Sequence, residues 1–170
     1  YPSYLIDLGE QQFTSYLVGP NSDFKTLKLL AIPGKSEGRD GMGISGHLQI
    51  SVGTSSPAIA SCLAVPRGGS EAFGAKAVAS RVDINGINFT KYSISDAGLG
   101  NRFAETAYVT LRNNVCYKIE VIESGRGFSA GANIDKRTAE VEKIKYGFPF
   151  SAWDVFDQLN PVVQKFKFTI

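Results

Sequence analysis

The clearest pattern in the chain is the alternation of apolar and polar positions in its middle third. Val78, Ser80, Val82 and Ile84 alternate with polar neighbours, and Asn85-Gly86 follows at once. Strict alternation predicts a half-buried strand, and Asn-Gly predicts a tight hairpin turn because both residues accept positive φ. The pattern therefore predicts a hairpin with strands at 78–84 and 87–94.

A second hairpin follows after a connecting loop predicted at 95–101. Its strands are expected at 103–112 and 115–122, with Asn113-Asn114 as the turn between them. Four strands joined in this way form an antiparallel meander. Further strands are predicted at 26–32, at 47–52 and, from the spacing of Phe166, Phe168 and Ile170, at the end of the chain.

Helices and loops are predicted around these strands. Pro57 suits the first turn of a short helix that Pro66 ends, and residues 34–46 form a glycine-rich loop. Residues 138–145 favour a helix weakly. Ser151 and Asp154 have capping-box spacing before another helix, which Pro161 would interrupt. We expect one domain over 1–170 of the α+β class: an antiparallel sheet of about six strands flanked by a few α-helices.

Composition narrows the class of protein. Hydrophobic residues make up 43% of the 170 residues, which favours a folded core over a disordered chain. A net charge of +2 is too small for a nucleic-acid-binding surface, so no nucleic-acid partner is expected. No apolar run approaches the roughly 20 residues of a membrane-spanning helix.

The two cysteines, Cys62 and Cys116, leave two alternatives open. They can be buried free thiols, or they can pair and close a loop of about 55 residues, which would stabilise the fold by about 4 kcal/mol. Neither a Cys-x-x-Cys motif nor a Cys/His spacing is present, so no structural zinc site or other metal site is expected.

The usual catalytic and cofactor motifs are missing from the sequence. His47 is the only histidine, no serine lies in a Gly-x-Ser-x-Gly elbow, and His47 is interpreted as a surface residue at a strand end. Gly34-Lys35-Ser36 lacks the first glycine of a phosphate-binding loop, because that position is Leu29. The glycines after residue 124 are not followed by the helix of a dinucleotide-binding unit. No cofactor is therefore expected.

Two acid pairs are candidate catalytic groups. Glu120 and Glu123 have opposite parity on a strand, and Asp154 and Asp157 suit the solvated side of a helix. Glycoside hydrolysis requires two carboxyl groups that face one cleft. Neither pair meets that condition, so the chain is not expected to be an enzyme.

Part of the chain resembles a known group of proteins. The segments are 85–89 (Asn-Gly-Ile-Asn-Phe), 95–102 (Ser-Asp-Ala-Gly-Leu-Gly-Asn-Arg), 105–108 (Glu-Thr-Ala-Tyr), 111–113 (Leu-Arg-Asn) and 116–119 (Cys-Tyr-Lys-Ile). In this order they resemble uncharacterised bacterial exported proteins and lipoproteins of the PsbP-like type. The resemblance implies a PsbP-like sandwich, with a sheet of about six strands between helices. It also implies an extracytoplasmic setting, which favours a Cys62–Cys116 disulfide.

Together these observations predict a non-catalytic exported accessory or binding domain, with a protein or a small ligand as its unknown partner. Its expected location is periplasmic or extracellular. Contact with a membrane would come only through a lipid anchor before Tyr1. A small hydrolase or carbohydrate-active protein that uses an acid pair or a free cysteine is one alternative, and a binder of an apolar ligand between sheet and helices is another. The loop bearing Asp96, Asn101 and Arg102 can present polar groups at the surface or be a plain connection.

Overall fold

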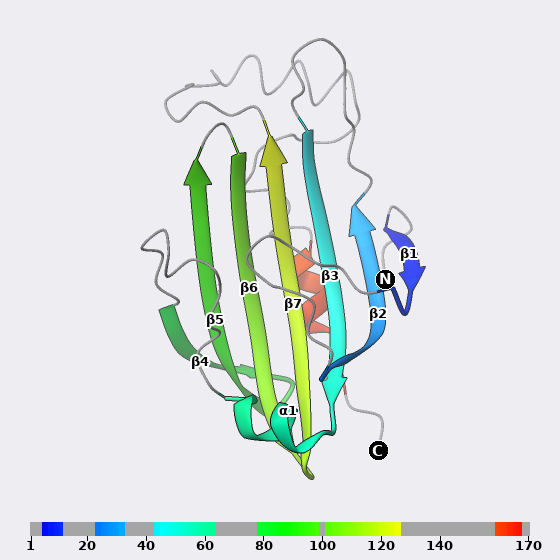
Figure 1. Ribbon diagram of the computed structural model, residues 1–170, viewed down its shortest axis with the longest axis vertical. Helices are drawn as coiled ribbons and strands as arrows, with labels where there is room; N and C mark the ends of the chain where they lie inside the picture. The colour runs from blue at the N-terminus through cyan, green and yellow to red at the C-terminus, as the bar shows by residue number, and fades with distance from the viewer. Residues whose placement is uncertain are drawn as a thin grey trace.

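The computed structural model describes residues 5–11, 23–32, 43–63, 78–98, 101–126 and 159–167. Within these residues the fold is one sheet of seven strands (Figure 1). The strands are β1 (Ile6–Gly9), β2 (Lys25–Ile32), β3 (Gly43–Gly53), β4 (Val78–Ile84), β5 (Ile87–Gly98), β6 (Asn101–Arg112) and β7 (Val115–Arg126). The described helical parts are α1 (Ser56–Ser61) and residues 159–164.

The sheet consists of two antiparallel meanders joined edge to edge. Its strand order is β1-β2-β3-β7-β6-β5-β4, so β3 ends the first meander and β7 ends the second. The β3–β7 ladder runs unbroken from the pair Gly43–Arg126 to the pair Gly53–Cys116. Because β3 precedes β4 in the sequence, the chain crosses to the far edge of the sheet before it returns strand by strand to β7.

Both predicted hairpin turns are confirmed. Asn85 and Gly86 have φ of 53° and 79°, and Asn113 and Asn114 have φ of 51° and 58°. Positive φ at both central residues is the signature of the two-residue turn whose twist matches that of its strands. The Asp83 carboxylate accepts a 2.9 Å hydrogen bond from the Gly86 amide and so supports the first turn.

The predicted fold class is wrong in its balance of sheet and helix. The sheet has seven strands rather than about six, and among the described residues only α1 and residues 159–164 are helical, so a sheet flanked by a few helices is not what the chain forms. The strands are also longer than predicted. Gly43 to Gly46, placed in a loop, pair with β7, and residues 95–98 extend β5. Ladder pairing satisfies backbone groups there and outweighs the low strand propensity of glycine.

Several predictions fall on residues that the structure does not describe. These are most of the loop 34–46, the helices expected at 138–145 and from Ser151 to Phe156, and the end of the predicted C-terminal strand. Helical residues 159–164 include Pro161, where a break was predicted, and Lys165 to Lys167 are not in a strand.

A different helical segment lies on each face of the sheet. The helix face is the face that carries Leu48, Tyr108 and Ile119, and Leu159 and Val163 of the C-terminal helical segment pack against it. The disulfide face is the opposite one, which carries Ala107, Cys116 and Glu120, and α1 lies on it. Figure 1 shows α1 and the red C-terminal helix on opposite sides of the sheet. Successive strand residues point to opposite faces, so each strand supplies both layers.

Candidate functional site

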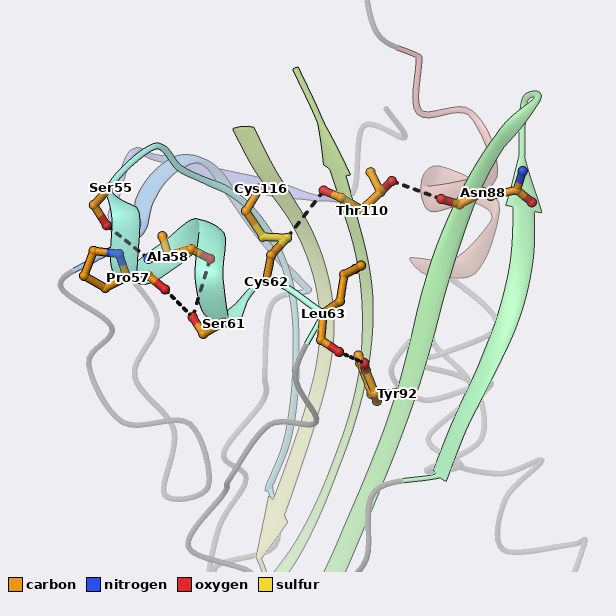
Figure 2. The surroundings of a disulfide bond; sticks show 10 residues. All are labelled: Ser55, Pro57, Ala58, Ser61, Cys62, Leu63, Asn88, Tyr92, Thr110 and Cys116. Carbon is orange, nitrogen blue, oxygen red and sulfur yellow. Dashed lines mark hydrogen bonds between the residues drawn. A yellow bond between two sulfur atoms is a disulfide. The ribbon is translucent and has the colours of Figure 1, made fainter. Parts of the chain in front are cut away.

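A buried disulfide joins α1 to the sheet. Cys62 lies at the C-terminal end of α1 and Cys116 at the start of β7, and their Cα atoms are 5.6 Å apart (Figure 2). The exposed fractions of the two residues are 4% and 0%. Of the two alternatives that the residues alone left open, the bridged one is present, so neither cysteine offers a thiol for nucleophilic chemistry.

The sequence around α1 explains why a helix forms at this point. The Ser55 hydroxyl caps the helix by accepting a 3.2 Å hydrogen bond from the Ala58 amide. Pro57 lies in the first turn, where its missing N–H costs no helical hydrogen bond, as predicted. The Ser61 hydroxyl donates to the Pro57 carbonyl at 2.8 Å. The helix ends at Ser61, before the predicted stop at Pro66.

Hydrogen bonds around the disulfide hold the residues that follow α1 against the sheet. The Tyr92 hydroxyl of β5 donates to the Leu63 carbonyl at 2.7 Å. The Cys62 sulfur lies 3.7 Å from the Thr110 carbonyl oxygen, and the Thr110 hydroxyl donates to the Asn88 carbonyl at 3.0 Å (Figure 2). The end of α1 is therefore tied to β5, β6 and β7, and this region is structural in character.

A cluster of polar side chains lies further along the disulfide face. Gln49 of β3 pairs with Glu120 of β7, which pairs in turn with Ala107 of β6. Glu105 lies two residues before Ala107 and Lys118 two residues before Glu120, so the pleat turns all of them to the same face. We call Gln49, Glu105, Lys118 and Glu120 the acid cluster.

Glu120 is the centre of the acid cluster. Its exposed fraction is 1%, and Gln49 and Glu105 are each 4% exposed. The Gln49 amide nitrogen donates to one Glu120 oxygen at 3.0 Å, and the Lys118 ammonium lies 2.5 Å from the other. The same ammonium lies 5.9 Å from the centre of the Phe24 ring. A buried carboxylate with a cation and an amide donor is compensated in the way that burial of charge requires.

Among the described residues, Glu105 has no comparable compensation. Burial, followed by repulsion from Glu120, raises the pKa of Glu105 to about 8, although attraction to Lys118 opposes the shift. A hydrogen bond with Glu120 also favours the protonated form of Glu105 and contributes to the raised pKa. The Glu105 carboxyl is therefore protonated at neutral pH and can donate a hydrogen bond to Glu120.

His47 is placed differently from its prediction. It lies inside β3, two residues before Gln49 and on the same face, and is not a strand-end surface residue. Burial lowers the pKa of His47, so the ring is neutral at physiological pH.

The structure separates the acid pair that the sequence suggested. Glu123 pairs with Gly46 and Ala104 and lies on the helix face, whereas Glu120 lies on the disulfide face. The two carboxyl groups cannot act on one substrate. Asp154 and Asp157 lie outside the described residues.

The predicted surface loop is largely strand. Asp96 of β5 pairs with Phe103 of β6, and Asn101 and Arg102 are the first two residues of β6. The hairpin continues to the pair Gly98–Asn101 because ladder hydrogen bonds form up to that point, so a loop from 95 to 101 is wrong.

Sequence reasoning missed Glu105 as a partner of Glu120. The signal was present: once Asn113-Asn114 is the turn, the register pairs Arg112 with Val115 and Ala107 with Glu120. Glu105 then occupies a diagonal position to Glu120 on the same face, within reach of long side chains.

Comparisons with known proteins add little to this geometry. No protein-family model and no curated protein matches the chain. A crystal structure of LpqN, described as involved in cell envelope biogenesis of Mycobacterium tuberculosis, is similar over 91% of this chain and 87% of that chain, with 12% sequence identity and a TM-score of 0.30. A similarity of this size does not establish a common fold.

The described residues contain no helix that is both long enough and apolar enough to cross a membrane. They also contain no group of three or more His, Cys, Asp or Glu side chains arranged to hold a metal ion.

Proposed function

We propose that the protein is a non-catalytic binding or accessory domain that works outside the cytoplasm. The observation that carries the proposal is the buried Cys62–Cys116 disulfide. Disulfides persist in oxidising compartments and are rare where cellular reductants keep thiols reduced. A bridge buried in the core, rather than exposed at a surface, is typical of a structural role in an exported protein.

Burial of the acid cluster supports a non-catalytic role. A general acid or base must come within hydrogen-bond reach of its substrate. Glu105 and Glu120 are 4% and 1% exposed, so a substrate does not reach them in this conformation. The disulfide leaves neither Cys62 nor Cys116 as a nucleophilic thiol. Glu120 and Glu123 lie on opposite faces of the sheet. The hydrolase alternative therefore loses the Glu120–Glu123 pair and the thiols, whereas Asp154 and Asp157 lie outside the described residues.

The helix face offers no support for an apolar ligand. Leu159 and Val163 pack directly against the cluster that contains Tyr108 and Ile119. Membership of the PsbP-like group and a lipid anchor rest on the sequence resemblance alone, and they stay part of this proposal.

Thiol counting combined with cell fractionation tests the proposal. The protein is purified from its native cells, with free thiols blocked at lysis, and is denatured without reductant. We expect no reactive thiol before reduction, two after it, and recovery of the protein in the extracytoplasmic fraction. A Cys62→Ala/Cys116→Ala variant is the control for labelling background. Two free thiols, or recovery in the cytoplasm, would contradict the proposal.

A further inference from the structure

Glu105 and Glu120 form a buried carboxyl pair, and one cation, Lys118, lies beside Glu120. Lys118 contacts Glu120 directly, and Gln49 donates to the same carboxylate. One oxygen of Glu105, Oε2, is buried and accepts no hydrogen bond from the part of the chain that the structure describes. Two ionised carboxylates cannot share such a site at low cost, because both are desolvated and repel each other. One proton is therefore part of the packed structure.

Other titratable groups lie on the same face of the described strands. They include His47 of β3 and Tyr92 of β5, and the Tyr92 hydroxyl donates a hydrogen bond to the Leu63 carbonyl. Asp96 of β5 pairs with Phe103, two positions from Glu105 along β6. Helix α1 carries no titratable side chain. The charges that shift the pKa of Glu105 are those of Glu120, which raises it, and Lys118, which lowers it.

We propose that the acid cluster is a proton-dependent lock between the central strands β6 and β7. With the Glu105 carboxyl protonated, the buried pair carries one negative charge, which Lys118 balances. Loss of that proton leaves two buried carboxylates against a single lysine, and this excess buried charge is relieved only when unfolding brings water to Glu105. The protein should thus unfold more readily in a mildly alkaline medium than in a mildly acidic one.

The sign of the pH dependence follows from the direction of the shift. The pKa of Glu105 is about 8 in the folded chain and 4.5 in the unfolded chain. Between pH 4.5 and pH 8 the folded chain therefore holds a proton that the unfolded chain has released. The stabilising effect is complete below about 4.5 and is lost as the pH rises through about 8. One additional bound proton changes the unfolding equilibrium constant about tenfold per pH unit in that window.

A carboxyl titration by NMR tests the protonation directly. Glutamate is labelled with ¹³C at the side-chain carboxyl carbon, and the folded protein is titrated from pH 4 to pH 9. We expect one resonance with a midpoint near 8, which is absent from Glu105→Gln and retained in Glu10→Gln, where the replaced residue is exposed and pairs with Lys25. Midpoints below 6 for every glutamate would overturn the proposal.

Unfolding measurements test the lock itself. Glu105→Gln keeps a neutral donor to Glu120 and cannot ionise. The ratio of the wild-type to the Glu105→Gln unfolding constants, measured in urea, should rise about tenfold per pH unit between about 5 and 8 and then level off. Parallel profiles for the two proteins would overturn the lock.

Lys118→Met is a second variant that does not depend on the folding of Glu105→Gln. Because Lys118 lowers the pKa of Glu105, its loss should move the titration midpoint of Glu105 to higher pH. An unchanged or lower midpoint would count against the proposed charge balance. If neither variant folds, the titration of the wild-type protein still decides the question.

Discussion

At the scale of single residues, Asn85 serves two purposes. Its φ of 53° forms the β4–β5 turn, and its amide donates to the Gln164 and Phe166 carbonyls at 2.8 Å and 2.7 Å. Those carbonyls lie at the end of the C-terminal helical segment, where the helix leaves acceptors without partners. A turn residue thus caps a helix about 80 positions away in the chain.

Replacing Asn85 should separate its two roles. Asn85→Gly keeps the turn and loses both hydrogen bonds, so we expect the free energy of unfolding to fall by about 1–3 kcal/mol. Asn113→Gly is the matched control, because Asn113 has an equivalent φ of 51° in the other turn, and it should be nearly neutral. Urea unfolding followed by circular dichroism gives both values, and an equal loss in the two variants would refute the capping role.

Strand β3 packs closely against α1 at Gly53. A Cβ atom there would lie 2.5 Å from the Cβ of Ala58 in α1. Gly53→Ala should therefore destabilise the fold by about 1–3 kcal/mol through overpacking. Adding Ala58→Gly removes the obstructing methyl group, so the double variant should lose less than the sum of the two single losses. Strict additivity in urea unfolding would argue against this contact.

At the scale of elements, the disulfide determines how α1 sits on the sheet. Helix α1 has six residues, too few to be stable by itself in water. Its serine cap closes the first turn, and packing of Ala58 near Gly53 and the bridge to β7 attach it to the sheet. The bridge spans 54 positions and so removes much freedom from the unfolded chain.

Removing the disulfide should lower stability without changing the sheet. For Cys62→Ala/Cys116→Ala we expect a loss of about 4 kcal/mol in the free energy of unfolding, on the chain-entropy model. Reductant should destabilise the wild-type protein by a similar amount and leave the variant unaffected. Urea midpoints with and without reductant measure this, and a reductant effect on the variant would contradict the assignment.

Elements also show which sequence signals were reliable. Asn85-Gly86 and Asn113-Asn114 identified both hairpins. The two-residue turn requires positive φ at both positions, and few residues other than Asn and Gly adopt it. Strand ends were not predictable from the same local information. Gly43 and Gly98 belong to strands because a partner strand lies beside them, and no local pattern reports that partner.

At the scale of the whole molecule, stability should be graded across the sheet. Among the described strands β2, β3, β7, β6 and β5 are paired on both sides, whereas β1 and β4 are paired on one. We expect the slowest amide hydrogen exchange in β3, β6 and β7, near the rate of global unfolding, and faster exchange in β1 and β4. Residue-resolved exchange by NMR checks this order. Protection of β4 equal to that of β7 would contradict it.

The sequence by itself determined the two hairpins, the β4–β7 meander and the short helix opened by Pro57, since each depends on neighbouring residues. The disulfide was favoured only through resemblance. The tertiary structure alone decided the β3–β7 pairing and the seventh strand. It also decided the meeting of Glu105, Glu120 and Gln49, because contacts between distant segments are selected by burial and register across the sheet rather than by local preference.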